Sequence, residues 1–413
     1  MLRRRSVLLA APAVVAASRL RAAQSVKVGV MFPLTGASAA SGGEAKAAVE
    51  TAVEIINKGH PELKGLTVGL TPGLAGLGGA TIEPVFVDHR GDPAMAQSLA
   101  QKLIANDKVS ALFGAYHSSC AMTATAVSER YGVPFVVADS VAANITERGF
   151  KYTFRVTPIA TNFADSYMRF LQDQKKAGHD VSSVAIVNEN TDYGSSVGAA
   201  IEAEAKKVGF PVAIRIPYSA NGPDVSAQVL QLKNANPSVA LFVSYASDAI
   251  LFMRTMKTLD YLPGMIIGDS AGFSDPSFLP AVGGISKGLV NRSVWSKGPE
   301  GSLSYGINAI YQARTGNEIS DVSGRAMQAF FVLADALNRA GSTDPSKLQA
   351  ALRATNMPHS AMFIGYRGVQ FDQSGQNVQS ATYLTQLQGK DYTTIWPDDA
   401  AVAKVMWPMA GWR

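Results

Sequence analysis

The chain of 413 residues has one cysteine, five histidines and only 17% charged residues. A single cysteine, Cys120, cannot form an intramolecular disulfide, and such a residue most often packs as a small hydrophobic side chain. The histidines lack the spacing of a metal-ligating motif, so we expect no metal or other cofactor. No Gly-x-Gly-x-x-Gly follows the first predicted strand, and Ser118 does not lie in a Gly-x-Ser-x-Gly elbow. These absences argue against an enzyme.

An excess of one charge is also lacking outside the first 23 residues. Residues 1–23 contain five arginines and no acidic residue, and removing them leaves 32 basic and 32 acidic residues. A neutral chain has no global field to attract phosphate or anionic lipid. We therefore expect no nucleic-acid partner and no binding to a membrane surface.

The segment 1–23 has the composition of an export signal. Arg3-Arg4-Arg5 precede an apolar stretch, 7–17, that is too short to span a bilayer. The run Arg4-Arg5-Ser6-Val7-Leu8 resembles a twin-arginine signal, and the Sec route stays open. We predict cleavage after Ala22 or Ala23. No later segment is apolar for 18 residues, so we expect a soluble protein exported to the periplasm.

From Val26 onward, short β-rich runs alternate with helical patterns, which predicts parallel sheets covered by helices. The rhythm starts again after Pro158, so we expect two α/β lobes with ligands at the carboxyl ends of the strands. We also expect a hairpin-like pair, 66–70 and 82–87, around a glycine-rich turn. The other strands are expected at 26–32, 110–115, 135–138, 184–187, 212–216, 239–244, 265–267, 369–371 and 381–388.

Several short motifs occur in an order that resembles a known family. Among them are Pro33-Leu34-Thr35-Gly36, Leu112-Phe113-Gly114-Ala115, Asp192-Tyr193-Gly194 and Phe371-Asp372-Gln373-Ser374-Gly375. They resemble the branched-chain amino-acid-binding proteins, which are type I periplasmic solute-binding proteins of ABC transporters. The resemblance spans nearly the whole chain after the export signal.

This resemblance implies two doubly wound parallel-sheet lobes joined by a three-strand hinge. We place the crossings near Thr157, Trp295 and Gly365. Lobe 1 is then 24–157 plus 296–364, and lobe 2 is 158–295 plus 365–413. The resemblance also implies a monomeric receptor that binds an amino acid and delivers it to membrane permease subunits. A receptor for an aromatic or aliphatic acid without an amine, or a ligand-sensing protein of the same fold, is the alternative.

Candidate ligand residues in the first lobe follow from the positions of serines after strands. Ser118 and Ser119 lie at a predicted helix N-terminus, where free N–H groups and the helix dipole favour a carboxylate. By position they match the carboxylate-binding segment of the resembled family, although Ser118 as a simple helix cap is the alternative. Ser140 follows the next strand. At the place where family amino-acid binders have a threonine, this chain has Val141.

In the second lobe, Tyr193 and Tyr245 correspond to ligand-contacting aromatics of that family, with core or rim packing as the alternative. Trp295, near the second crossing, is expected either to form a wall of the cleft or to pack in the hinge. Family amino-acid binders carry a glutamate after the strand 265–267, where this chain has Asp269 or, with a shift of one residue, Ser270. Asp269 is thus the predicted partner of a ligand ammonium, and Asp139 is the alternative.

Overall fold

The structure, a computed structural model, describes residues 25–412. The predicted export signal lies outside the described residues. Among the described helices, none combines the length and the apolar character that a membrane crossing requires.

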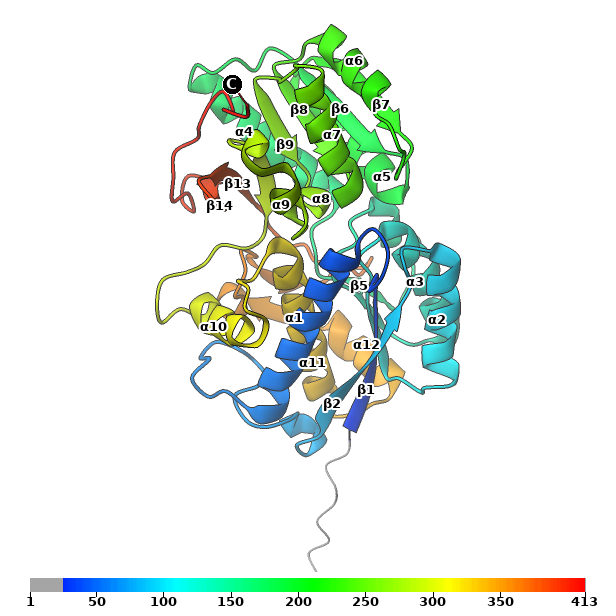
Figure 1. The fold of residues 1–413 in the computed structure, drawn as a ribbon. Coiled ribbons are helices and arrows are strands. Elements are labelled where there is room, and N and C mark those ends of the chain that lie inside the picture. The colour runs from blue at the N-terminus through cyan, green and yellow to red at the C-terminus, as the bar shows by residue number, and fades with distance from the viewer. Residues whose placement is uncertain (1–24, 413) are drawn as a thin grey trace, which may run out of the picture.

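The first sheet lies in the lower lobe of Figure 1 and has the strand order β2-β1-β3-β4-β5, with every neighbouring pair parallel. Strand β1 is an interior strand, since it pairs with β2 on one side and with β3 on the other. Its last five residues are all buried. The strands are β1 (Ser25–Phe32), β2 (Thr81–Asp88), β3 (Ala111–Gly114), β4 (Phe135–Val137) and β5 (Thr153–Arg155).

The second sheet has the order β14-β13-β10-β9-β8-β6-β7. Its strands β6 to β10 run parallel, whereas β13 pairs antiparallel with both β10 and β14. A small antiparallel pair, β11 with β12, stands apart. The strands are β6 (Val184–Glu189), β7 (Val212–Tyr218), β8 (Val239–Val243), β9 (Met265–Gly268), β10 (Val290–Ser293), β11 (Asn356–Pro358), β12 (Gly368–Gln370), β13 (Tyr383–Gln388) and β14 (Asp391–Trp396).

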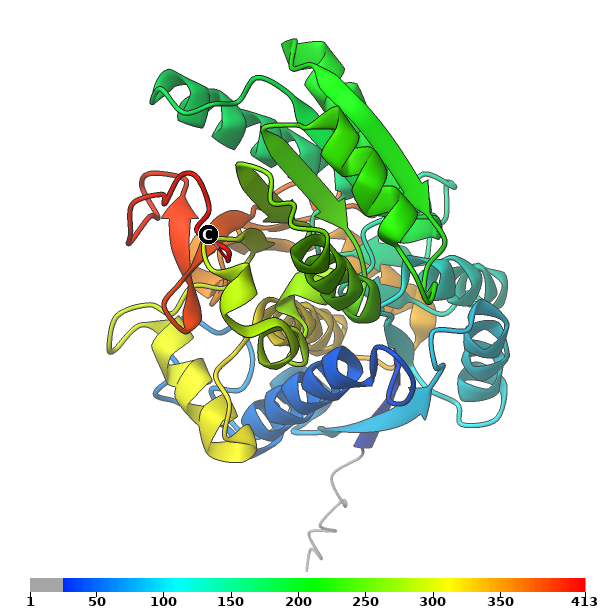
Figure 2. The same ribbon diagram turned by 45° about the horizontal axis from the view of Figure 1, so that its top comes forward.

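Helices cover both sheets, and the two views show two lobes stacked on one another (Figure 1, Figure 2). The lower lobe holds α1 (Ala39–Lys58), α2 (Pro93–Ala105), α3 (Ser118–Tyr131), α10 (Leu303–Thr315), α11 (Asp321–Ala340) and α12 (Pro345–Arg353). The upper lobe holds α4 (Ala160–Lys176), α5 (Asp192–Val208), α6 (Ser226–Ala235), α7 (Ala246–Thr258), α8 (Ala271–Ser274) and α9 (Phe278–Val282).

A local sequence signal sets the start of helix α2, which follows β2. Helix α2 begins with Pro93, and the Asp92 carboxylate accepts hydrogen bonds from the N–H groups of Ala94 and Met95 at 2.7 and 3.0 Å. Helix α11 is buried along most of its length and packs against α1, although these helices are far apart in the sequence. Together with α10, it forms the part of the first lobe that follows the crossing after β10.

The prediction that 66–70 and 82–87 form a hairpin-like pair is wrong. Strand β2 pairs parallel with β1, and residues 66–70 form bends rather than a strand. The glycine-rich segment instead closes on itself through the bridge between Leu74 and Ala80. The second sheet also differs from a purely parallel one, because β13 and the unpredicted β14 add an antiparallel edge.

The chain passes between the two sheets three times, between β5 and β6, between β10 and α10, and between α12 and β13. The exact lobe boundaries stay a prediction.

Gly114 shows how closely the central strands approach at the end of β3. Its φ is +131°, and a Cβ added there would lie 2.2 Å from the Met31 carbonyl oxygen. We expect Gly114→Ala to lower the free energy of unfolding by about 2–5 kcal/mol, from backbone strain and overpacking together. Chemical denaturation of the variant measures this loss.

The matched control is Gly149→Ala, which has φ +70° and no atom within 4 Å of an added Cβ. It should lose only the conformational term of about 1–2 kcal/mol. Equal losses in the two variants would contradict the packing of β3 against β1.

Candidate functional site

A small cavity lies where the carboxyl ends of strands from both lobes meet. In this conformation the volume of the cavity is about 10 Å³, which is room for about one water molecule. Residues of both lobes contact one another around this cavity, as the Tyr116 and Tyr245 rings do. The residues around the cavity are Tyr116, Ser118, Asp139, Val141 and Arg325 from the first lobe, and Tyr193, Tyr245, Ala271 and Arg292 from the second.

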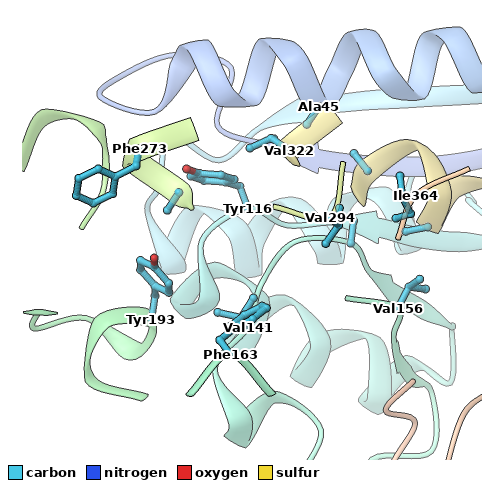
Figure 3. Packing of buried hydrophobic residues seen from close by; sticks show 14 of the residues in the cluster. Ala45, Tyr116, Val141, Val156, Phe163, Tyr193, Phe273, Val294, Val322 and Ile364 are labelled. Carbon is cyan, nitrogen blue, oxygen red and sulfur yellow. The ribbon is translucent and has the colours of Figure 1, made fainter. Parts of the chain in front are cut away.

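Three tyrosines form the aromatic wall. The Tyr245 ring lies 5.0 Å from the Tyr193 ring and 5.7 Å from the Tyr116 ring, measured between centroids. Figure 3 shows Tyr116 and Tyr193 reaching toward this region from the two lobes, with Val141 nearby. All three rings are buried, so each can cover an apolar or aromatic group of a ligand.

A buried ionic network lies beside the tyrosines. Arg292 on β10 donates through Nε to Asp269 Oδ1 at 2.8 Å, and its Nη1 lies 3.8 Å from Asp321 Oδ2. Arg325 pairs with Asp321 at 2.9 Å and approaches Asp139 at 3.4 Å. These five groups, two guanidiniums and three carboxylates, are all at most 4% exposed. They are concentrated at the contact between the lobes.

The network leaves two groups without a hydrogen bond among the described residues. One is Nη1 of Arg292, and the other is the Asp139 carboxylate, whose contact with Arg325 is an ion pair without hydrogen-bond geometry. Burial raises the pKa of Asp139 to about 7, even though Arg325 acts to lower it. Burial also opposes ionisation of Asp321, but Arg325 and Arg292 outweigh it and hold the pKa of this carboxyl below its usual range.

The structure places three of the seven predicted residues at the cavity: Ser118, Tyr193 and Tyr245. The Ser118 hydroxyl oxygen accepts from the N–H groups of Val141 and Ala142 at 3.2 Å, so it also fastens the loop after β4. The Tyr193 hydroxyl donates to Asp269 at 2.8 Å. Their roles toward a ligand stay predictions.

The other four predicted residues are not among the cavity walls. Ser119 lies in the first turn of α3 and is half-buried, whereas Ser140 is fully buried and donates to the Ala115 carbonyl at 2.8 Å. The Asp269 carboxylate already accepts from Arg292, Tyr167 and Tyr193, and the Arg292 guanidinium is its counterion. Asp139 is the alternative partner of a ligand ammonium, and both of its carboxylate oxygens lack a hydrogen bond among the described residues.

Trp295 faces a different cavity, of about 260 Å³. This cavity is larger, but its charged lining residues are all acidic: Asp275, Glu318, Asp321 and Asp391. A carboxylate ligand would meet repulsion there, whereas the smaller cavity offers the Arg292 guanidinium. We therefore place the candidate site at the smaller cavity.

The sequence reasoning missed Arg292, Arg325, Tyr116 and Ala271. Arg292 lies between the apolar pairs Leu289-Val290 and Val294-Trp295, and this position was the available signal for a buried cation, since such a residue requires a counterion. The Asp321 and Arg325 pair, four residues apart on one helix, was a second signal.

The sequence reasoning also overlooked a Gly-x-Ser-x-Gly segment at 268–272. It forms a strained strand-to-helix turn, with Ser270 at φ +48° and Ala271 at φ +31°. The Ser270 hydroxyl, however, donates to Asp321, and Ser270 is fully buried. Among the described residues, no hydrogen bond joins a histidine to Ser270, whose hydroxyl contacts Asp321 and Ser274. The turn instead places Ala271 at the cavity.

A sequence-family model described as "Periplasmic binding protein" matches residues 25–392, and the chain belongs to this family. Its members are binding proteins of the periplasm rather than enzymes. The Leu/Ile/Val-binding protein homolog 7 of Brucella suis biovar 1 (strain 1330) is 29% identical over 404 residues, covering 94% of this chain and 95% of that protein. The predicted resemblance to branched-chain amino-acid-binding proteins is confirmed.

Two solved structures show the same fold. The substrate-binding protein LivJ from Streptococcus pneumoniae in complex with isoleucine matches with a TM-score of 0.75 at 19% identity, over 91% of this chain and all of that one. A solute-binding protein of Rhodopseudomonas palustris BisB5 in complex with 3,4-dihydroxybenzoic acid matches with a TM-score of 0.74 at 21% identity, over 91% and 98% of the two chains. The predicted fold class is confirmed.

Removing the Arg292 charge tests the buried network. In Arg292→Met, Asp269 loses its ion-pair partner in a buried environment, and we expect the free energy of unfolding to fall by about 3–5 kcal/mol. Adding Asp269→Asn should recover part of that loss, because it removes the carboxylate left unpaired. Denaturant unfolding of the single and double variants measures both effects.

The control is Lys207→Met, which breaks a pair with Glu204 in which the lysine side chain is exposed. This change should cost less than about 1 kcal/mol. If Arg292→Met cost no more than Lys207→Met, the buried network would not contribute as described.

Proposed function

We propose that this protein is the extracytoplasmic receptor of an ABC importer, binding a small carboxylate between its lobes, with an α-amino acid favoured. The observation that carries the proposal is the pairing of two unsatisfied charges at one cavity. Nη1 of Arg292 is a free donor for a carboxylate, and the Asp139 carboxylate is a free acceptor for an ammonium. A zwitterion presents both groups at once.

Charge balance favours the amine. The network has three carboxylates and two guanidiniums, so an added anion increases an existing excess of negative charge. Buried uncompensated charge is costly, and a zwitterion adds none. An acid without an amine fits only if Asp139 takes up a proton, which its pKa of about 7 permits. That acid is therefore the second candidate.

The second candidate has its own support in the aromatic wall. Three buried tyrosine rings at one small cavity suit a flat aromatic ligand as well as an aliphatic side chain. The structural neighbour from Rhodopseudomonas palustris holds 3,4-dihydroxybenzoic acid, whereas the Streptococcus pneumoniae neighbour holds isoleucine. Both candidates share the carboxylate, which we assign to Arg292.

The cycle of the receptor is opening and closing. Contacts between the lobes hold the closed form: Ser41 donates to Asp275 at 2.5 Å, and the Ala143 N–H donates to Ser196 at 3.0 Å. A ligand that bridges Arg292 and Asp139 adds contacts across the same boundary and so favours closure.

We further propose export through the signal at 1–23, by the Tat or the Sec route. In this proposal a periplasmic monomer then docks on permease subunits.

The first test replaces Asp139 with asparagine, which keeps the shape and removes the charge. We expect affinity for the cognate amino acid to fall by more than about tenfold, which equals about 1.4 kcal/mol. Affinity for the matching acid without the amine should stay the same or rise, since a repulsive charge is removed. Calorimetry, after a thermal-shift screen of amino acids and organic acids, measures both.

Asp165→Asn, an exposed aspartate on α4, serves as the control and should change neither affinity. Loss of binding for both ligands in Asp139→Asn would mean that Asp139 only supports the structure. If only sugars raised the melting temperature in the thermal-shift screen, the prediction of a carboxylate ligand would be wrong.

The pH dependence of binding separates the two ligand classes by sign. Asp139 has a pKa of about 7, so it is protonated below pH 7 and loses its attraction for an ammonium. Affinity for an amino acid should therefore fall by up to about tenfold per pH unit between pH 7 and pH 5. Affinity for an acid without an amine should rise over the same interval. A pH-independent affinity for both classes would exclude Asp139 from the site.

A further inference from the structure

Three potential metal ligands lie together at the edge of the first lobe, outside the cavity walls. They are His89, which follows β2, His117, which precedes α3, and Cys120 in the first turn of α3. One ligand atom from each lies within 4.8 Å of the other two. His89 is far in the sequence from His117 and Cys120, but β2 and β3 flank β1, so their carboxyl ends meet at one edge of the sheet.

Two nitrogen atoms of this cluster are unsatisfied. Nε2 of His89 and Nδ1 of His117 are buried and have no hydrogen-bond partner. Both rings are close, with centroids 5.7 Å apart in an edge-to-face arrangement. Buried imidazole nitrogens normally have a partner, so two orphans beside a thiol indicate a group that the protein chain itself does not supply.

We propose that His89, His117 and Cys120 form a binding site for a borderline divalent metal ion such as Zn²⁺. Two imidazole nitrogens and one thiolate are a donor set that Zn²⁺ prefers, and the fourth tetrahedral position is left for water. Bond lengths of about 2.0–2.3 Å place tetrahedral ligand atoms about 3.5 Å apart. The observed spacing of up to 4.8 Å is wider than this. Side-chain movements that shift the ligand atoms by about 1 Å would close the cluster around an ion.

The surrounding hydrogen bonds orient one ligand and oppose another. Nε2 of His117 lies 3.2 Å from the Ser38 hydroxyl, so it can donate there and leave the Nδ1 lone pair for the metal. Nδ1 of His89 accepts from the Gly91 N–H at 3.0 Å, which puts the proton of this neutral ring on Nε2. Coordination through Nε2 moves that proton to Nδ1 and gives up the bond to Gly91, a cost that lowers the affinity.

The proposed metal site would also lie next to the aromatic wall. The His117 ring is 4.8 Å from the Tyr245 ring of the second lobe and 5.2 Å from the Tyr116 ring. An ion at His117 is thus one side chain away from the aromatic wall. This proposal does not depend on which solute the receptor binds.

The experiment uses untagged, metal-free mature protein and Zn²⁺ alone as the probe. Equilibrium dialysis with elemental analysis should give one Zn²⁺ per chain. His117→Gln and Cys120→Ala should each weaken binding by at least about 100-fold, since changes to outer-shell partners alone cost about 10- to 100-fold. His359→Gln, an exposed histidine far from the cluster in sequence, should bind like the wild type.

Co²⁺ gives a second readout, because a thiolate ligand adds a sulfur-to-metal absorption band that Cys120→Ala should abolish. Circular dichroism checks that each variant is folded, and His89→Gln replaces His117→Gln if the latter is not. Absence of saturable Zn²⁺ binding by the wild type would overturn the proposal. Binding that persists in both the histidine and the cysteine variants would overturn it equally.

Discussion

Two arginines buried with three aspartates at the contact between the lobes set the conditions for the rest of the site. Five charged groups withdrawn from water are expensive, and their mutual attraction offsets that cost only where the geometry is good. Here Arg292 with Asp269 and Arg325 with Asp321 are well paired, whereas Asp139 and Nη1 of Arg292 are not. The incomplete pairing is located where a ligand would complete it.

The same network links the two halves of the fold. Asp139 follows β4, and Arg325 lies on α11, both in the first lobe, whereas Arg292 lies on β10 in the second sheet. Asp321 joins them, because it faces Arg292, pairs with Arg325 and accepts from Ser270 after β9. Separating the lobes therefore exposes charges to water, and closing them buries the charges again. A ligand that neutralises the leftover charges shifts this balance toward the closed form.

Much of the fold could be predicted from the sequence, because alternating apolar strands and amphipathic helices have few parallel-sheet solutions. The pattern could not reveal that 66–70 is no strand or that β14 extends the second sheet, since both depend on which edge is free to pair. At the site, the places of Tyr193 and Tyr245 were predictable from their correspondence to ligand-contacting aromatics of the resembled family. The pairing of Asp269 with Arg292 was not, because the two side chains meet only through the packing of β9 against β10. Likewise, the sequence shows His117 and Cys120 three residues apart but hides their proximity to His89, which the order of β2, β1 and β3 creates.

We propose above all that the interlobe cavity recognises a compact molecule with a carboxylate, and we favour one that also has an amine. Mass spectrometry of the small molecule released by denaturing the freshly purified protein tests this claim most directly. The account predicts an α-amino acid or, failing that, an organic acid whose carboxylate Arg292 can bind. A neutral sugar or a ligand with no acidic group as the released species would contradict it.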